Sequence, residues 1–165
     1  MRSLVKVFLT GVGLVVMLIA SVTVASAGER GSLIDFESMI PVTGVAVGAV
    51  NDRGIKGGGL PWAITSGEGS VSKNGTVDVR VTGLVIPVPP LNGTNPVPFF
   101  KATVSCLNHH KVVNTSTGSF PANLAGDSHI HARITLPRHC QSPILFVVAP
   151  TGQWFAQSNL DLDDD

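Results

Sequence analysis

The feature that most constrains the fold of this chain is a two-residue period, in which apolar and polar side chains alternate along short runs. Residues 76–86 contain three valines at every second position with polar residues between them, and residues 99–106 and 129–136 repeat the pattern. A period of two places successive side chains on opposite faces of a β-strand, whereas a helix repeats every three to four residues. The 18 Gly and 11 Pro of the chain also argue against a helical bundle. We therefore expect an all-β fold.

Turn signals separate these runs. Asn74-Gly75 favours a type I′ hairpin, and the proline-rich residues 87–96 cannot form a central strand. The continuous apolar run 144–149 predicts a strand buried on both faces, and residues 62–65 and 153–157 add two short strands. About eight to ten strands at this spacing indicate one domain, an antiparallel β-sandwich of immunoglobulin-like or jelly-roll-like type.

The first residues have the pattern of an export signal. Arg2 and Lys6 precede a mostly apolar run over residues 7–20, and Ala25-Ser26-Ala27 has the small-x-small pattern of a cleavage site. The alternative is an uncleaved membrane anchor, because the apolar run approaches the length that spans a bilayer. We expect cleavage, no stable membrane anchor afterwards, and a secreted, extracellular or periplasmic protein. The predicted division is a signal peptide over 1–27, a β-sandwich domain over 28–158 and an acidic flexible tail over 159–165.

Charge and composition limit the partners. Eleven basic residues balance eleven acidic ones, charged residues make up 13% and hydrophobic residues 44%. These values exclude a disordered chain and argue against nucleic-acid binding, which requires a basic excess. Trp62 and Trp154 are more typical of packing than of a stacking platform. The expected partner is an extracellular protein or a surface ligand. Asn74, Asn92 and Asn114 begin glycosylation sequons that matter in a eukaryotic source.

Two cysteines in an exported chain predict a disulfide between Cys106 and Cys140. Cys106 has the same parity as the apolar residues of its run, so it should face the core. The bridge would close a loop of about 34 residues. The alternative is that the two thiols form a metal-ligand set with His109, His110 or His139.

Histidines suggest the sharpest functional hypothesis. His129 and His131 are two residues apart, so they share the polar face of the predicted strand at 129–136. Two imidazoles on one face can bind zinc or copper, and His109 or His110 could complete the site. The alternative is a solvated strand face on which polar residues simply alternate.

Motifs for catalysis are weak. Ser70 and Lys73 match an S-x-x-K spacing, but they fall in a predicted hairpin strand rather than at a helix start. His131, Asp127 and Ser119 could converge only through the fold. We therefore expect a non-catalytic extracellular binding or structural module. We expect it to have no cofactor. The alternatives are a zinc- or copper-binding protein that uses surface histidines, and a hydrolase whose site is assembled only in the fold.

Several short sequence segments resemble those of other proteins. They are Gly58-Gly59-Leu60-Pro61-Trp62, the run 81–85, Asn95-Pro96 leading to Val104-Ser105-Cys106, and Leu136-Pro137 leading through Cys140 to Pro143-Ile144. Together they resemble small secreted microbial all-β proteins that have no known activity. The resemblance implies a fold and export, and it assigns no residue a role.

Overall fold

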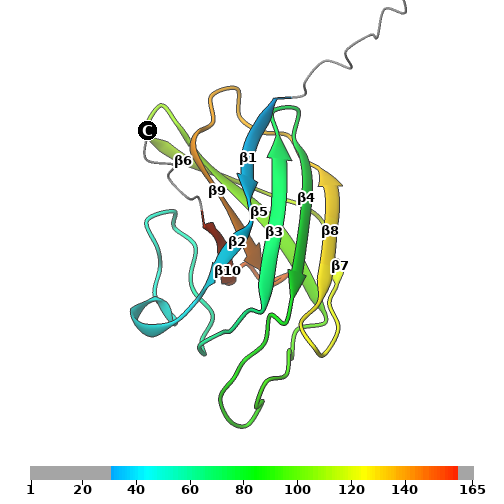
Figure 1. Cartoon of the computed structure of the whole chain (residues 1–165). Helices are drawn as coiled ribbons and strands as arrows, with labels where there is room; N and C mark the ends of the chain where they lie inside the picture. The colour runs from blue at the N-terminus through cyan, green and yellow to red at the C-terminus, as the bar shows by residue number, and fades with distance from the viewer. Residues whose placement is uncertain (1–30, 160–165) are drawn as a thin grey trace, which may run out of the picture.

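The structure is a computed structural model that describes residues 31–159, and these residues form two antiparallel sheets packed face to face as a β-sandwich (Figure 1). The predicted signal peptide over 1–27 and residues 160–165 of the predicted tail over 159–165 lie outside the described residues. Sheet A has the order β1 (Ser32–Phe36), β3 (Ser66–Ser72), β4 (Thr76–Thr82), β8 (Ser128–Arg133). Sheet B has the order β2 (Ser38–Pro41), β10 (Trp154–Asn159), β9 (Gln141–Val148), β5 (Phe99–Asn108), β6 (Lys111–Ser116), with β7 (Phe120–Pro121) paired to β5. The prediction of an all-β sandwich in one domain is confirmed.

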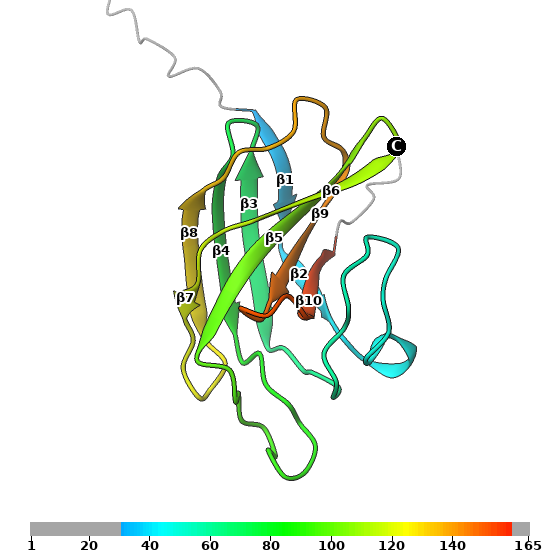
Figure 2. The same cartoon turned by 180° about the vertical axis from the view of Figure 1, so that it is seen from behind.

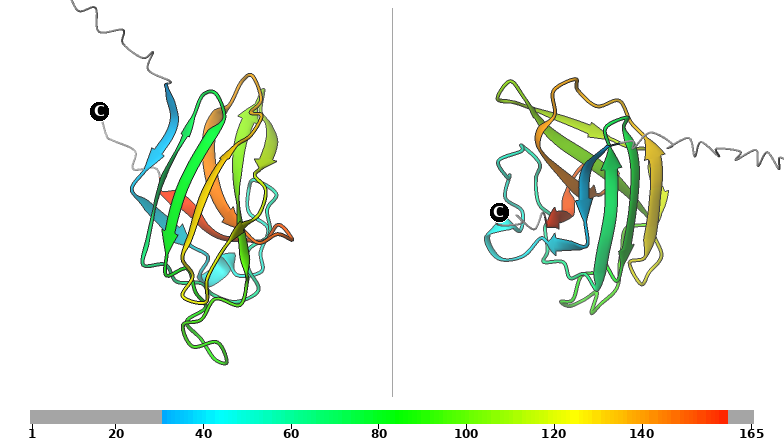
Figure 3. Two further views of the ribbon diagram at one scale, coloured as in Figure 1. Left: turned by 90° about the vertical axis from the view of Figure 1, so that its right-hand side faces the viewer. Right: turned by 45° about the horizontal axis from the view of Figure 1, so that its top comes forward.

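The core lies between the two sheets and follows the predicted alternation. In β4, the three valines at 77, 79 and 81 are at most 2% exposed, whereas Arg80 between them is exposed. In β8, Ile130 is fully buried and His129 and His131 on either side of it are exposed. Figure 2 shows sheet B in front of sheet A, and Figure 3 shows the two layers from the side and from above. The alternate residues that point inward from each strand therefore form the core, and the outer face of sheet A is polar.

Part of the outer face of sheet B is covered as well, because residues 51–57 bond to two of its strands. Arg53 links these strands, since its Nη2 donates to the Ser142 carbonyl and its own carbonyl accepts from Asn114 Nδ2. Phe146 and Trp154 of the same sheet pack edge to face at 5.8 Å, and both are at most 5% exposed. The run 144–149 is buried on both faces from Leu145 onward, as predicted.

Three local predictions differ from the structure. The hairpin at Asn74-Gly75 exists, but its loop has three residues, 73–75, of which only Gly75 has a positive φ. A type I′ turn has a two-residue loop in which both residues have a positive φ. Residues 62–65 form one isolated bridge from Ala63 to Val85 and no strand. The strand beginning at residue 76 stops at Thr82, because Gly83 takes a φ of +66° with no room for a Cβ beside Thr65.

The disulfide between Cys106 and Cys140 is formed, and its half-cystines are 34 residues apart in sequence. It joins β5 to the residue before β9, so both ends belong to the same sheet. The alternative in which the cysteines are metal ligands is therefore wrong for this state of the protein. Within residues 31–159, no helix is long and apolar enough to cross a membrane.

Candidate metal centre

The site is built where β4 and β8 pair on the outer face of sheet A. The two strands are antiparallel neighbours, and their register places Asp78 opposite His131 and Arg80 opposite His129. Val79 and Ile130 pair between these two rows and point into the core. The side chains of Asp78, His129 and His131 must therefore point outward, because residues of the opposite parity are held inside.

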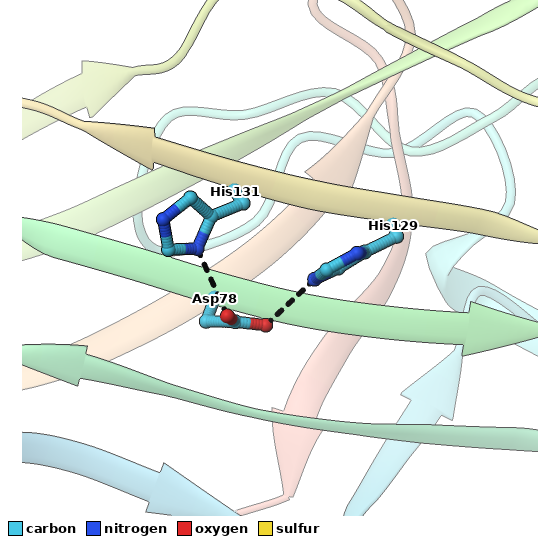
Figure 4. Close-up of side chains that lie close together, drawn as sticks. All are labelled: Asp78, His129 and His131. Carbon is cyan, nitrogen blue, oxygen red and sulfur yellow. Dashed lines mark hydrogen bonds and ion pairs between the residues drawn. The ribbon is translucent and has the colours of Figure 1, made fainter.

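Both histidines converge on the carboxylate of Asp78 (Figure 4). His129 Nε2 lies 2.9 Å from Asp78 Oδ1, and His131 Nδ1 lies 2.9 Å from Asp78 Oδ2. The side chains are 43% exposed for Asp78, 43% for His129 and 62% for His131. Each carboxylate oxygen thus has its own imidazole partner at a solvent-accessible place.

The electrostatics of the cluster favour a charged carboxylate. Partial burial raises the pKa of Asp78, but hydrogen bonds from His129 and His131 and the attraction of the two imidazoles outweigh it, so the pKa lies below its usual value. The carboxyl group is consequently ionised at neutral pH. It offers negative charge between two nitrogen donors.

The donor set is suited to a divalent transition metal. Among the described residues, this is the one group of three or more His, Cys, Asp or Glu side chains whose ligand atoms all lie within 4.8 Å of one another. Zinc ligands about 2.1 Å from a tetrahedral ion lie roughly 3.4 Å apart. The two nitrogen–oxygen distances of 2.9 Å would lengthen to reach this spacing, and the nitrogen–nitrogen distance is at most 4.8 Å; exposed side chains can make such adjustments. Two nitrogens and one carboxylate oxygen would leave coordination positions open to water.

The other predicted ligands lie elsewhere. His109 and His110 form the two-residue turn between β5 and β6, at φ values of 48° and 65°, on sheet B. The ring of His109 packs edge to face against that of His139 at 5.0 Å, close in sequence to the disulfide. Asp78 is thus the third group that the fold brings to His129 and His131. The alternation over residues 76–86 puts Asp78, between Val77 and Val79, on the polar face of its strand, but nothing in the sequence indicates that β4 and β8 are neighbours.

The residues considered for hydrolysis are engaged separately. Asp127 Oδ2 accepts from Asn123 Nδ2 at 3.0 Å, and its Oδ1 accepts from the Gly83 N–H at 2.9 Å. These two hydrogen bonds lower the pKa of Asp127 against a smaller effect of burial. His131 contacts Asp78, and Ser119 lies in the segment between β6 and β7. Asp127 is therefore tied to the loop after β4 and to Asn123.

Comparison of the chain with protein-family models, with curated proteins and with solved structures gave no match.

Proposed function

We propose that this chain is an exported β-sandwich protein that binds a divalent transition-metal ion, Zn²⁺ or Cu²⁺, at Asp78, His129 and His131. The observation that carries the proposal is the convergence of two imidazoles on one carboxylate, each at 2.9 Å. A merely solvated strand face does not require these three side chains to converge. Of the functions that the sequence suggested, the geometry supports metal binding best.

The roles of the three side chains follow from their atoms. His129 would bind through Nε2 and His131 through Nδ1, and Asp78 would supply an oxygen and balance the charge of the ion. The nitrogens that now face the carboxylate would bind the metal with their lone pairs, and the hydrogen of each neutral ring would then be on its other nitrogen. Copper should bind more tightly than zinc, because affinity at such sites follows the Irving–Williams order.

Export is part of the same proposal. Its support is the charged, apolar and small-residue pattern of residues 1–27 together with the disulfide Cys106–Cys140, a bond typical of oxidising compartments. N-terminal sequencing of protein collected from the medium or periplasm tests it. We expect the mature chain to begin at Gly28, and a chain that begins at Met1 would overturn this part.

The experiment for metal binding is calorimetric titration of the oxidised protein with Zn²⁺ and Cu²⁺. We expect one ion per chain, and Asp78→Asn or His131→Gln should weaken binding by about tenfold or more. The matched control is His110→Gln, because His110 is also exposed but lies in the β5–β6 turn. Equal affinity in wild type and both site variants would contradict the proposal, and so would an equal loss in the control.

A further inference from the structure

A second feature of the molecule is a hollow of about 470 Å³ at the end of the sandwich where three connections meet. One wall comes from residues 56–62, another from Ile86, Pro96 and Val97 in the long connection after β4, and the third from the hairpin between β9 and β10. The volume lies within the range of about 300–1,000 Å³ found for small-molecule sites. It shares no lining residue with the metal ligands.

A packed aromatic cluster supports one side of the hollow. Trp62 and Phe155 stack at 3.9 Å with their planes 21° apart, and Phe100 meets both rings edge on, at 6.4 and 5.9 Å. Trp62 is 3% exposed and Phe155 is 4% exposed, so these rings back the wall rather than present an open face. The apolar surface that a ligand can reach comes from the aliphatic lining residues Leu60, Ile86, Pro96 and Val97.

Two consecutive glycines shape the wall. A Cβ at Gly58 would lie 2.7 Å from Trp62 Nε1 and 3.3 Å from Phe155 Cδ1, so the backbone can lie on the aromatic pair only without a side chain. Gly59 also lines the hollow, but a Cβ there would meet nothing within 4 Å. The space beside Gly59 is therefore space that a side chain could fill.

The charge of the lining indicates the kind of ligand. Lys56 is the only ionisable residue among those that line the hollow, and no carboxylate is present among them. Gln153 accepts a hydrogen bond from Thr151 through Oε1, which leaves its amide N–H groups to donate. A positive charge and amide donors beside an apolar wall complement a ring that carries an acidic group.

We propose that this hollow binds a small anionic aromatic molecule, an aromatic carboxylate or sulfonate, with its ring against the apolar side chains of Leu60, Ile86 and Val97 and its acidic group near Lys56. The ring would occupy the space beside Gly59. The proposal is independent of the metal site, because none of the lining residues belongs to it.

The test uses two fluorescent probes with one aromatic skeleton. 8-Anilinonaphthalene-1-sulfonate carries an anionic group, and N-phenyl-1-naphthylamine lacks it. In fluorescence titrations of the folded protein, we expect one binding site, with the sulfonate bound about threefold to tenfold more tightly than the neutral probe. Lys56→Gln should remove this preference and leave the neutral probe unaffected. The matched control is Lys111→Gln, since Lys111 is exposed on β6.

A second pair of variants tests the location. Gly59→Val should weaken both probes by about tenfold or more, because its side chain would occupy the hollow. Gly118→Val is the control, since Gly118 also has open space around it and lies in another loop, between β6 and β7. Thermal melts of each variant establish that the fold is kept. Absence of binding, unchanged binding to Gly59→Val, or equal loss in Gly118→Val would overturn the proposal, and Asp78→Asn should leave both probes unaffected.

Discussion

Removal of the disulfide is the perturbation whose magnitude follows most directly from the structure. Cys106 and Cys140 are 34 residues apart. In the chain-entropy model, freeing a loop of this length adds about 12.6 cal/mol/K to the unfolded state, or about 3.8 kcal/mol at 25 °C. In the double variant Cys106→Ala/Cys140→Ala, the fully buried Cys106 side chain also loses one atom of core packing, which costs about 1 kcal/mol more. We therefore expect the free energy of unfolding to fall by about 5 kcal/mol.

The assay is urea unfolding followed by tryptophan fluorescence, with the wild-type protein measured in both oxidised and reduced form. With a slope of about 2 kcal/mol/M, a loss of this size lowers the midpoint by roughly 2.5 M. The reduced wild type keeps both sulfur atoms, so it should lose only the loop contribution of about 4 kcal/mol. The reasoning fails if both forms lose less than about 1 kcal/mol, because the bridge would then impose no constraint on the unfolded chain.

The remaining predictions concern the metal, two hydrogen-bonded carboxylates and one glycine. Zn²⁺ at about 100 times its dissociation constant should stabilise the fold by about 2.7 kcal/mol, visible as a higher melting temperature; a gain that persists in His131→Gln would contradict the site. The pKa values of Asp78 and Asp127 are lowered in the folded state, so the stability that they contribute is complete above about pH 4 and is lost as the pH falls through the folded values; acid titrations of Asp127→Asn should show a shallower loss than those of the wild type. Asp127→Ala removes the acceptor for the Gly83 and Asn123 donors and should cost about 1–2 kcal/mol in chemical denaturation. Gly83→Ala should cost more than about 2 kcal/mol, because φ is +66° and the new Cβ would meet Thr65, whereas Gly118→Ala should change stability by less than about 0.5 kcal/mol.

The parts of the fold that could be predicted are those that depend on the alternation of apolar and polar side chains along one strand. Val77, Val79 and Val81 are buried because alternation requires them to share a face, and the same rule places His129 and His131 in solvent. The disulfide could be predicted because the chain has only two cysteines.

The site could be predicted only in part, because half of it depends on a contact between distant strands. Asp78 and His131 are 53 residues apart in sequence and lie directly opposite each other in the sheet. Alternation along a strand indicates the face of the sheet to which each side chain points. It does not indicate which other strand pairs with that strand. The sequence therefore offers His109 and His110, which lie close to Cys106 in the chain, as the third metal ligand. The structure offers Asp78 instead, on the adjacent strand.

Turn chemistry explains the local errors. His109 and His110 form the two-residue turn with two positive φ values that Asn74-Gly75 was expected to form. The tight pairing of β5 with β6 requires this geometry even though histidine favours it less than asparagine or glycine. Tertiary pairing thus overrides the preference of the turn residues.

The segment 51–57 that crosses sheet B makes the two flanks of this protein unequal. Part of one flank is covered by this segment, and the other carries Asp78 between its two histidines, all three of them at least 43% exposed. Within residues 31–159, an ion held there would stay in contact with solvent. Its exchange with chelators in the surrounding fluid would then be governed by the strength of three bonds and by the local pH.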